Sequence, residues 1–590
     1  MLLAAPLMPD TLTPDAWGFG RRRSTDHPCP QLSIVNADDL DLTDVEIRLL
    51  CGDPEGDRIG KAWKSIPPAQ AERSFRNFLQ DRGYHFPKFK PRADGGLELD
   101  PGELTKVRSV SGVGVPEEAG LDSYRGIRGE PFTPKKISLA KSWLKRRMQE
   151  IGYPCPEIEA RGFPATGEVR LTWVNPAPKA TIEGLSESRA QDIPAHILRR
   201  SDAFHLGDRY SLIETEITGK RTADRRTVSA HDLAPVCPID ERETPPDRIV
   251  IDESTVVGPP RKIALGLLVN TEVGPEARAS WAHTRLGRAV SHAGVALRGS
   301  YREQSGRAFA QWFYANTSTR AHLAPLISFA HQNERPYELL AFRTRALWET
   351  DGDFTTGLWK VAFGPGWQNL QQIDGVGPLN SSFFSTHLEL EYQTHRFEYF
   401  ASSPRDGYQA GLSITAVPSH VSQVGHPVLA SVHQHWITAI GRADPPWIVF
   451  AARGRAFSTF LPSHTRMQDV PIDFRNWMGG GQDLRGFGRK ELPTSNLGAR
   501  TGATIGTELR AVHVLPWDLE PIVLFDAAVL RTGLDVASES SQMFWNIGGG
   551  LRWESPVGTV RSTVAHGFDV DHPNSDLSHW QFFLSLGEEF

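Results

Sequence analysis

The sequence predicts a membrane β-barrel of about 16 antiparallel strands over residues 261–590, with small α/β units in front of it. Two observations carry this prediction: an internal α/β repeat precedes residue 260, and period-two alternation of apolar residues takes over afterwards. No stretch approaches the roughly 18–20 consecutive apolar residues that a spanning helix needs. A form of this chain that spans a membrane therefore requires a closed barrel, which satisfies every backbone hydrogen bond in lipid.

The alternation is clearest at the two ends of the predicted barrel, where every second residue is apolar, as a lipid-facing strand requires. Twelve of the 16 tryptophans follow residue 261, which suits aromatic girdles at the membrane interfaces. Twelve strands with long loops, or a soluble β-sandwich or propeller, are the alternatives. The apolar faces consist of Ile263, Leu265, Leu267 and Val269 at the start, and of Trp580, Phe582, Leu584, Leu586 and Phe590 at the end.

The repeat in front of the barrel is a helix that ends at a Gly-Tyr pair and is followed by a short strand. Residues 68–82 place apolar side chains on one helical face and run into Gly83-Tyr84, and residues 137–151 do the same before Gly152-Tyr153. Glycine suits the end of a helix because it adopts positive φ. The predicted unit has roughly 70–80 residues and occurs about three times before residue 260.

Four cysteines, Cys29, Cys51, Cys155 and Cys237, all precede the predicted barrel. An even count fits one or two disulfides in an oxidising compartment, with three possible pairings. Buried free thiols are the alternative. Because no Cys-x-x-Cys spacing occurs, the sequence does not favour a zinc site.

Composition and motifs exclude several classes of function. A net charge of −6 spread along the chain gives no reason to expect a nucleic-acid partner. No serine-hydrolase elbow, metalloprotease motif or phosphate-binding loop is present, so we expect no enzymatic activity, no cofactor and no metal. The start MLLAAPLMPD lacks a basic n-region, so no signal peptide is predicted, although an exported barrel is expected to carry one.

Residues 471–493 carry a family resemblance. An aromatic residue and a glycine pair precede a hydrophobic-Arg-Gly-aromatic tetrad, and this pattern resembles the loop signature of the BamA/TamA superfamily of outer-membrane assembly factors. Residues 404–407, 548–568 and the strand from Leu265 are similar to other barrel segments of the family. The loop motif consists of Gly479, Gly480, Leu484, Arg485, Gly486 and Phe487.

The resemblance implies a role for each part of the chain. It implies that the motif loop folds into the barrel and that Arg485 contacts an acidic residue on the inner wall, for which Asp526 is the nearest match. An arginine in a barrel interior needs such a partner to offset desolvation. Three polypeptide-transport-associated (POTRA) domains, as in the TamA branch, are implied at residues 31–103, 104–177 and 178–260, after an N-terminal segment at residues 1–30.

The function implied is insertion or translocation of proteins at the bacterial outer membrane, with the POTRA domains in the periplasm. Clients would be unfolded autotransporter-like or other barrel proteins, and an inner-membrane-anchored partner of the TamB kind would bind the first POTRA domain. The alternatives are a two-partner secretion transporter and a passive porin. A weakly paired seam between the first and last strands is expected, with contributions from Gly548, Gly549, Gly550, Trp580, Phe582 and Phe590.

Overall fold

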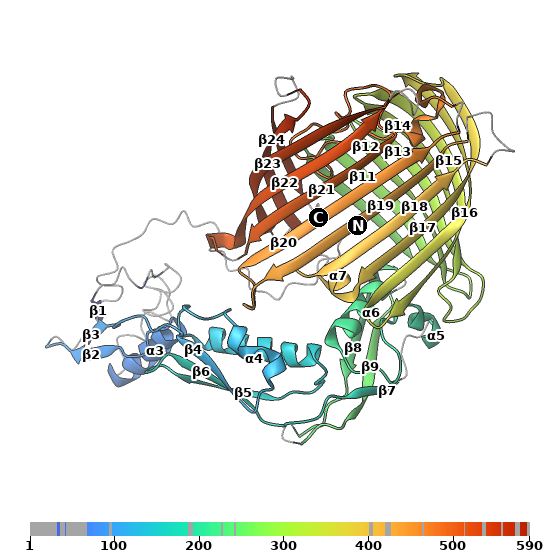
Figure 1. Cartoon of the computed structure of the whole chain (residues 1–590). Coiled ribbons are helices and arrows are strands. Elements are labelled where there is room, and N and C mark those ends of the chain that lie inside the picture. The colour runs from blue at the N-terminus through green and yellow to red at the C-terminus, as the bar shows by residue number, and fades with distance from the viewer. Residues whose placement is uncertain are drawn as a thin grey trace, which may run out of the picture. The chain divides into compact units, whose positions relative to one another are not determined.

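The chain divides into two compact units in the computed structural model (Figure 1). One comprises the residues up to Lys179 together with Cys237–Asp247, and the other comprises Ala180–Val236 and Arg248–Phe590. Among the described residues, no helix has the length and apolar character needed to cross a membrane. Residues 1–30, Cys29, Cys51 and Phe590 lie outside the described residues, which are 32–35, 40, 42, 68–93, 97–186, 193–225, 228–240, 243–400, 405–418, 426–462, 465–512, 514–533, 539–555, 558–572 and 579–586.

Three α/β units precede the barrel, and each contains a three-stranded sheet of the same topology. The third strand lies in the centre, parallel to the first strand and antiparallel to the second. The predicted fold class is therefore confirmed for this part, whereas the domain boundaries stay predictions. The units consist of β1 (Leu32–Ile34), α3 (Pro68–Asp81), β2 (Lys88–Pro91) and β3 (Leu97–Asp100); β4 (Ser109–Val113), α4 (Pro134–Glu150), β5 (Ile158–Phe163) and β6 (Glu168–Trp173); and β7 (Thr181–Leu185), α5 (Ala195–Leu198), α6 (Leu212–Asp224), β8 (Ala230–Pro235) and β9 (Arg248–Val256).

The Gly-Tyr pairs end the helices of the first two units in the same way. Gly83 and Gly152 have φ values of 96° and 110°, which other residues rarely adopt. The amide of Tyr84 then donates to the carbonyl of Leu79 at 2.8 Å, and the amide of Tyr153 donates to that of Met148 at 3.0 Å. These bonds turn the chain back toward the sheet, as in a Schellman motif. Cys155 and Cys237, which both belong to the compact unit that includes the residues up to Lys179, form a disulfide, as one of the predicted pairings allows.

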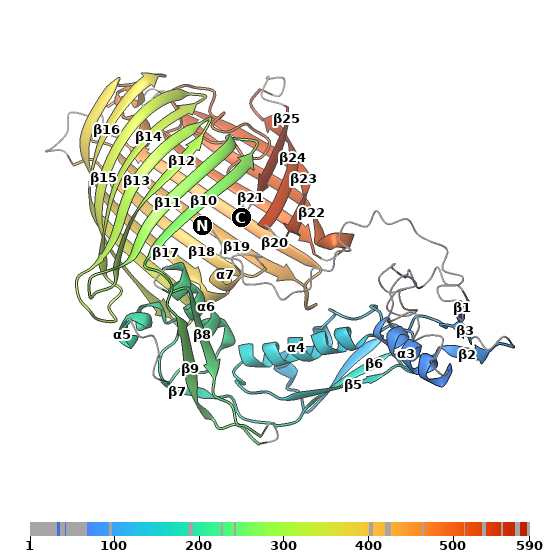
Figure 2. The same cartoon turned by 180° about the vertical axis from the view of Figure 1, so that it is seen from behind.

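The rest of the chain forms one 16-stranded antiparallel sheet that curls into a nearly closed barrel (Figures 1 and 2). Each strand pairs with its neighbours in sequence, which confirms the predicted fold class. A short helix, α7 (His395–Tyr399), follows the eighth strand. The strands are β10 (Arg261–Asn270), β11 (Gly274–Leu286), β12 (Ser291–Ser300), β13 (Glu303–Phe313), β14 (His322–Glu334), β15 (Tyr337–Phe354), β16 (Gly357–Asp374), β17 (Asn380–Thr394), β18 (Gly407–Ala416), β19 (Val428–Ile440), β20 (Ile448–Phe460), β21 (Thr501–Ala511), β22 (Leu519–Thr532), β23 (Ser540–Ser555), β24 (Gly558–Asp569) and β25 (Trp580–Leu586).

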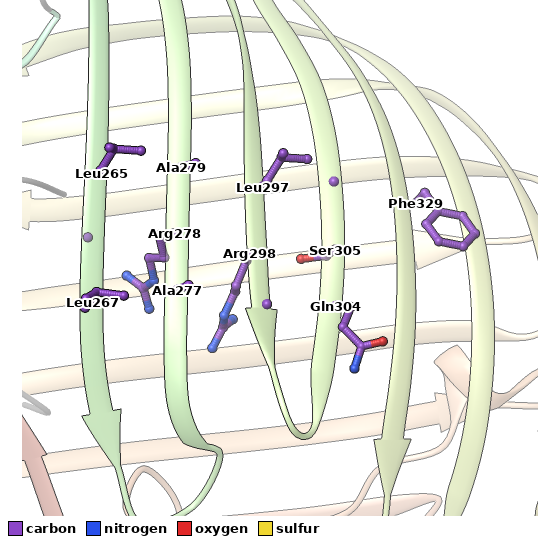
Figure 3. A pocket seen from close by; sticks show the side chains of 13 residues that line it. Leu265, Leu267, Ala277, Arg278, Ala279, Leu297, Arg298, Gln304, Ser305 and Phe329 are labelled. Carbon is purple, nitrogen blue, oxygen red and sulfur yellow. The ribbon is translucent and has the colours of Figure 1, made fainter.

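The two faces of the sheet differ as the alternation predicts. On β10, Ile263, Leu265, Leu267 and Val269 are between 64% and 84% exposed, because they point outward. Beside them lies an outward-facing apolar groove of about 990 Å³ on β10–β14, which Figure 3 shows between Leu265 and Phe329. Charged residues occupy the opposite face, where the side chains of Glu508 and Arg510 on β21 are fully buried.

Candidate functional site: the lumen loop and the barrel seam

The segment between β20 and β21, of which residues 461–462 and 465–500 are described, folds against the inner wall of the barrel. Its apolar side chains Met478, Leu484, Phe487 and Leu492 are inaccessible to solvent. They form one apolar cluster with inward-facing residues of three barrel strands, which are Phe457 of β20, Ala528 and Leu530 of β22, and Phe544 of β23. We call this segment the lumen loop.

A tight hairpin, residues 478–492, forms the tip of the lumen loop. The amide of Met478 donates to the carbonyl of Leu492 at 2.7 Å, and the amide of Leu492 donates back at 3.0 Å. The predicted glycine pair, Gly479 and Gly480, follows with φ values of 109° and 104°. These values, and close contacts that a Cβ atom would make with the carbonyl of Gly488 and the carboxylate of Glu272, require glycine at both positions.

Arg485 lies at the centre of a buried ion-pair network. Its Nη2 and Nε donate to the two carboxylate oxygens of Asp526 at 2.6 Å and 3.0 Å. Its Nη1 donates to Glu508 at 2.7 Å, and its backbone amide donates to Asp526 at 3.1 Å. A second donor, Asn546 Nδ2, reaches Asp526 at 3.0 Å. The structure thus places the two residues that the motif pairs, Arg485 and Asp526, in direct contact.

Glu508 is a member of this network that the sequence reasoning missed. It faces Arg485 from β21 and also accepts hydrogen bonds from Arg510, at 2.6 Å, and from Arg561 of β24. The available signal was the spacing Glu508-Leu509-Arg510 on an alternating strand, which puts two opposite charges on the inward face. Two carboxylates together offset the desolvation of a guanidinium that has no access to water.

The glycine and the aromatic residue of the tetrad fit a close approach between loop and wall. A Cβ atom on Gly486 would lie 2.5 Å from Cβ of Asn546 and 2.7 Å from Cα of Gly567 on β24. Only two facing glycines let the backbones come this close. Phe487 then packs edge-on against Phe544, with ring centroids 5.6 Å apart.

The lumen loop is also bound to the part of the wall formed by β14 and β15. Asp473 accepts two hydrogen bonds from Arg343 of β15, at 2.7 Å and 2.9 Å. Arg489 and Lys490 both reach Glu334 of β14, at 2.8 Å and 3.3 Å. Sequence reasoning missed these contacts, because they join segments about 130 to 155 residues apart. The loop therefore extends across the lumen between two walls and is bound to both.

The seam is the place where the 16-stranded sheet does not close. β10 and β25 are the two ends of the sheet and are not paired with each other as strands among the described residues. Just after β10, the amide of Thr271 donates to the carbonyl of Leu584 at 3.3 Å, and the amide of Leu584 donates to Oγ1 of Thr271 at 3.1 Å. Of the residues predicted here, Trp580 and Phe582 lie on β25 and point outward.

The prediction that Gly548, Gly549 and Gly550 belong to the seam is wrong. They lie in β23, which pairs with β22 on one side and with β24 on the other, two strands from the edge. Their backbone groups are therefore in regular ladders. The glycines serve close packing instead, since a Cβ on Gly548 would lie 2.6 Å from Cβ of Ala565. A glycine run on an alternating strand does not by itself distinguish an edge strand from a crowded inner one.

The third α/β unit is docked on the end of the barrel through charged side chains. Arg221 of α6 donates to both carboxylate oxygens of Asp353, at 2.9 Å each, and to those of Glu398 in α7, at 2.7 Å each. Figure 2 shows α6 beside α7. His395 of α7 shares Asp353, with Nε2 2.9 Å from Oδ1. Burial lowers the pKa of His395, but hydrogen bonds with Asp353 and Glu214 more than offset this and raise the pKa to about 9.

A 16-stranded antiparallel barrel with an unclosed seam and a loop bound inside its lumen belongs to the class of outer-membrane β-barrels. Residues 401–590 match the model of the Omp85 superfamily domain, so this chain carries an Omp85 superfamily domain. The resemblance is thereby confirmed for residues 401–590 at the level of the superfamily, whereas the TamA branch stays a prediction. No curated protein matches this chain.

The solved structures that resemble the fold include BamA and CdiB. BamA from Haemophilus ducreyi lacking POTRA domains 1–3 aligns with 13% identity and a TM-score of 0.46, over 78% of this chain and 94% of that one. CdiB from Escherichia coli aligns with 11% identity and a TM-score of 0.44, over 88% of this chain and 98% of that one. Similarities of this size carry no inference about function.

Proposed function

We propose that this protein inserts or translocates polypeptides at the bacterial outer membrane and assembles autotransporter-like or other β-barrel clients. The observation that carries the proposal is the seam. The described hydrogen bonds between the two edges involve Thr271, and β10 pairs with β11 on one side but with no strand on the side facing the seam among the described residues. An unpaired strand edge is a template to which another extended chain can add.

The lumen loop supports assembly over passive diffusion. A porin needs an open aqueous lumen, whereas here a loop crosses the lumen and is bound to both walls through Arg485 and through Arg489. A two-partner secretion transporter would likewise have to displace this loop to export a chain. Addition of a client strand at the seam would not require the loop to leave the lumen, because the client strand would pair with the edge of the sheet.

The α/β units contribute sheet edges to the proposed function. In each three-stranded sheet the first and second strands lie at the edges, so β2 and β5 each have a side that no strand of their own sheet covers. We propose that these edges hold unfolded clients in the periplasm by strand addition. Binding of a TamB-like partner at the first unit belongs to the same proposal and rests on the family resemblance alone.

Site-specific crosslinking in cells tests the proposal at the seam. A photo-crosslinking amino acid at Leu267 on β10, which is 84% exposed, should capture client barrel proteins during their synthesis. The matched control is Phe329 on β14, which is also outward and 51% exposed but lies away from the seam. Equal capture at both positions would contradict entry at the seam.

Depletion of the protein tests the client class. We expect autotransporters or other barrel proteins to decrease in the outer-membrane proteome before growth changes. If depletion left every barrel protein at its normal abundance, the assembly function would be refuted. Reconstituted protein should show small, fluctuating currents in planar bilayers, whereas a large and steady pore would indicate a porin.

A further inference from the structure

Two neighbouring residues in the hairpin between β10 and β11 bind different parts of the barrel. Thr271 hydrogen-bonds to Leu584 of β25 and so holds the last strand. Glu272, the next residue, accepts a hydrogen bond from the backbone amide of Gly481 in the lumen loop at 2.9 Å. Its own amide donates to Oδ1 of Asn270 at 2.7 Å, which fixes the turn that presents the carboxylate.

The same loop hairpin reaches the other edge of the seam. The carboxylate of Glu491 lies 3.7 Å from Nε2 of His579, the residue directly before β25. The carbonyl of His579 in turn accepts from the amide of Gly567 at 3.2 Å, so this residue is held in register with β24. Glu491 is also bound by Arg335 of the hairpin between β14 and β15.

Hairpin 478–492 therefore contacts both edges of the seam as well as both walls of the lumen. Glu272 links it to the first strand, His579 links it to the last strand, and Arg485 links it to the wall formed by β21 and β22. Glycine at position 480 is part of this fit, because a Cβ atom there would collide with the Glu272 carboxylate. A contact on both sides of an opening opposes its widening.

We propose that the lumen loop is a clasp across the seam: Glu272 and Glu491 tie hairpin 478–492 to the β10 and β25 edges, and the seam opens when these ties are released. Opening of the seam does not depend on the proposed function, but the entry of a client strand at the open seam rests on it. Both carboxylates make these contacts in the structure, and in an open seam they would lose them. Such differential contacts shift an equilibrium between a closed and an open seam.

Spin-label distances across the seam test the clasp in the full-length protein reconstituted in lipid nanodiscs. Keto amino acids at Leu267 and Phe582, both outward-facing and exposed, carry the labels and leave the native cysteines untouched. We expect Glu272→Ala to raise the long-distance population about tenfold, as loss of one charge-assisted hydrogen bond does to an equilibrium. Glu272→Gln should stay close to the unsubstituted protein, because its amide oxygen can still accept from Gly481.

Two further variants make the outcome decisive. Glu491→Gln keeps the size of the side chain but removes the charge that faces His579 and Arg335, and it should also broaden the distances. Glu338→Ala is the matched control, since this carboxylate contacts His331 at 2.9 Å and not the loop. Distances unchanged in both Glu272→Ala and Glu491→Gln, with a folded barrel, would overturn the clasp. A widened seam without client loss in cells would leave the clasp standing and refute the assembly function.

Discussion

Nη2 of Arg485 lies 2.6 Å from Oδ1 of Asp526, and neither side chain is accessible to solvent. The contact joins the lumen loop to β22 across 41 residues of sequence. Nη1 of Arg485 lies 2.7 Å from Oε2 of Glu508. Because a buried charge that loses its partner is costly, this network makes detachment of the loop a discrete event and opposes gradual loosening.

Removal of the central arginine should destabilise the barrel. Arg485→Ala leaves Asp526 and Glu508 with less compensation, and we expect the free energy of unfolding to fall by about 3–5 kcal/mol. Urea unfolding in detergent micelles measures the change. The control is Arg455→Ala, whose half-exposed ion pair with Asp483 at 3.5 Å should cost less than about 1 kcal/mol. Equal losses in the two variants would contradict a central role for Arg485.

Because the lumen loop lies so close to β24, a larger residue at position 486 should move the loop away from the wall. Gly486→Ala places a Cβ atom 2.7 Å from Cα of Gly567, so the tetrad must move away from the wall. We expect larger and longer-lived currents in planar bilayers, because the displaced loop obstructs the lumen less. Gly299→Ala, at a β12 position where a Cβ atom meets nothing within 4 Å, is the control and should leave the currents unchanged. Unchanged currents in Gly486→Ala would show that the loop does not limit conduction.

Docking of the third α/β unit depends on Arg221. Arg221→Ala removes four hydrogen bonds from Asp353 and Glu398 and leaves the nearly inaccessible Asp353 with fewer partners. Amide hydrogen exchange should therefore accelerate in α6 and α7 and stay unchanged in the strands distant from this junction. Arg225→Ala is the comparison, because its hydrogen bonds to Asp351 are long, at 3.3 Å and 3.4 Å, and we expect a smaller effect. Equal amide exchange rates in α6 and α7 of the two variants would contradict a dominant role for Arg221 in docking.

The same junction should respond to pH through His395. Its folded-state pKa is raised from 6.5 to about 9, so the protonated form is stabilised by folding. This contribution is fully present below about pH 6.5 and is lost as the pH rises through about 9. Amide exchange in α7 should thus accelerate between about pH 7 and pH 10, after correction for the intrinsic rate. His395→Gln should abolish this dependence, and a slope that persists in the variant would assign it to another group.

The sequence determined the elements and the class of fold, because these depend on local periodicity. Alternation at positions such as Leu265 and Leu267 marks a face toward lipid, and Gly83-Tyr84 and Gly152-Tyr153 mark helix ends through a backbone conformation that favours glycine. The tetrad around Arg485 identified the loop, since few other contexts combine these residues. It also indicated an acidic partner, and Asp526 lies there in the structure.

Tertiary structure alone decided which glycines lie away from the seam and what binds the loop. Glu508, Glu334 and Glu272 are unremarkable acidic residues in the sequence, and they became partners only when strands far apart in the chain closed around one lumen. The prediction that placed Gly549 at the seam was wrong for the same reason, since strand order determines whether a glycine lies at a sheet edge or between two paired strands. Local patterns report the faces of a strand, whereas register and closure are set by contacts between distant segments.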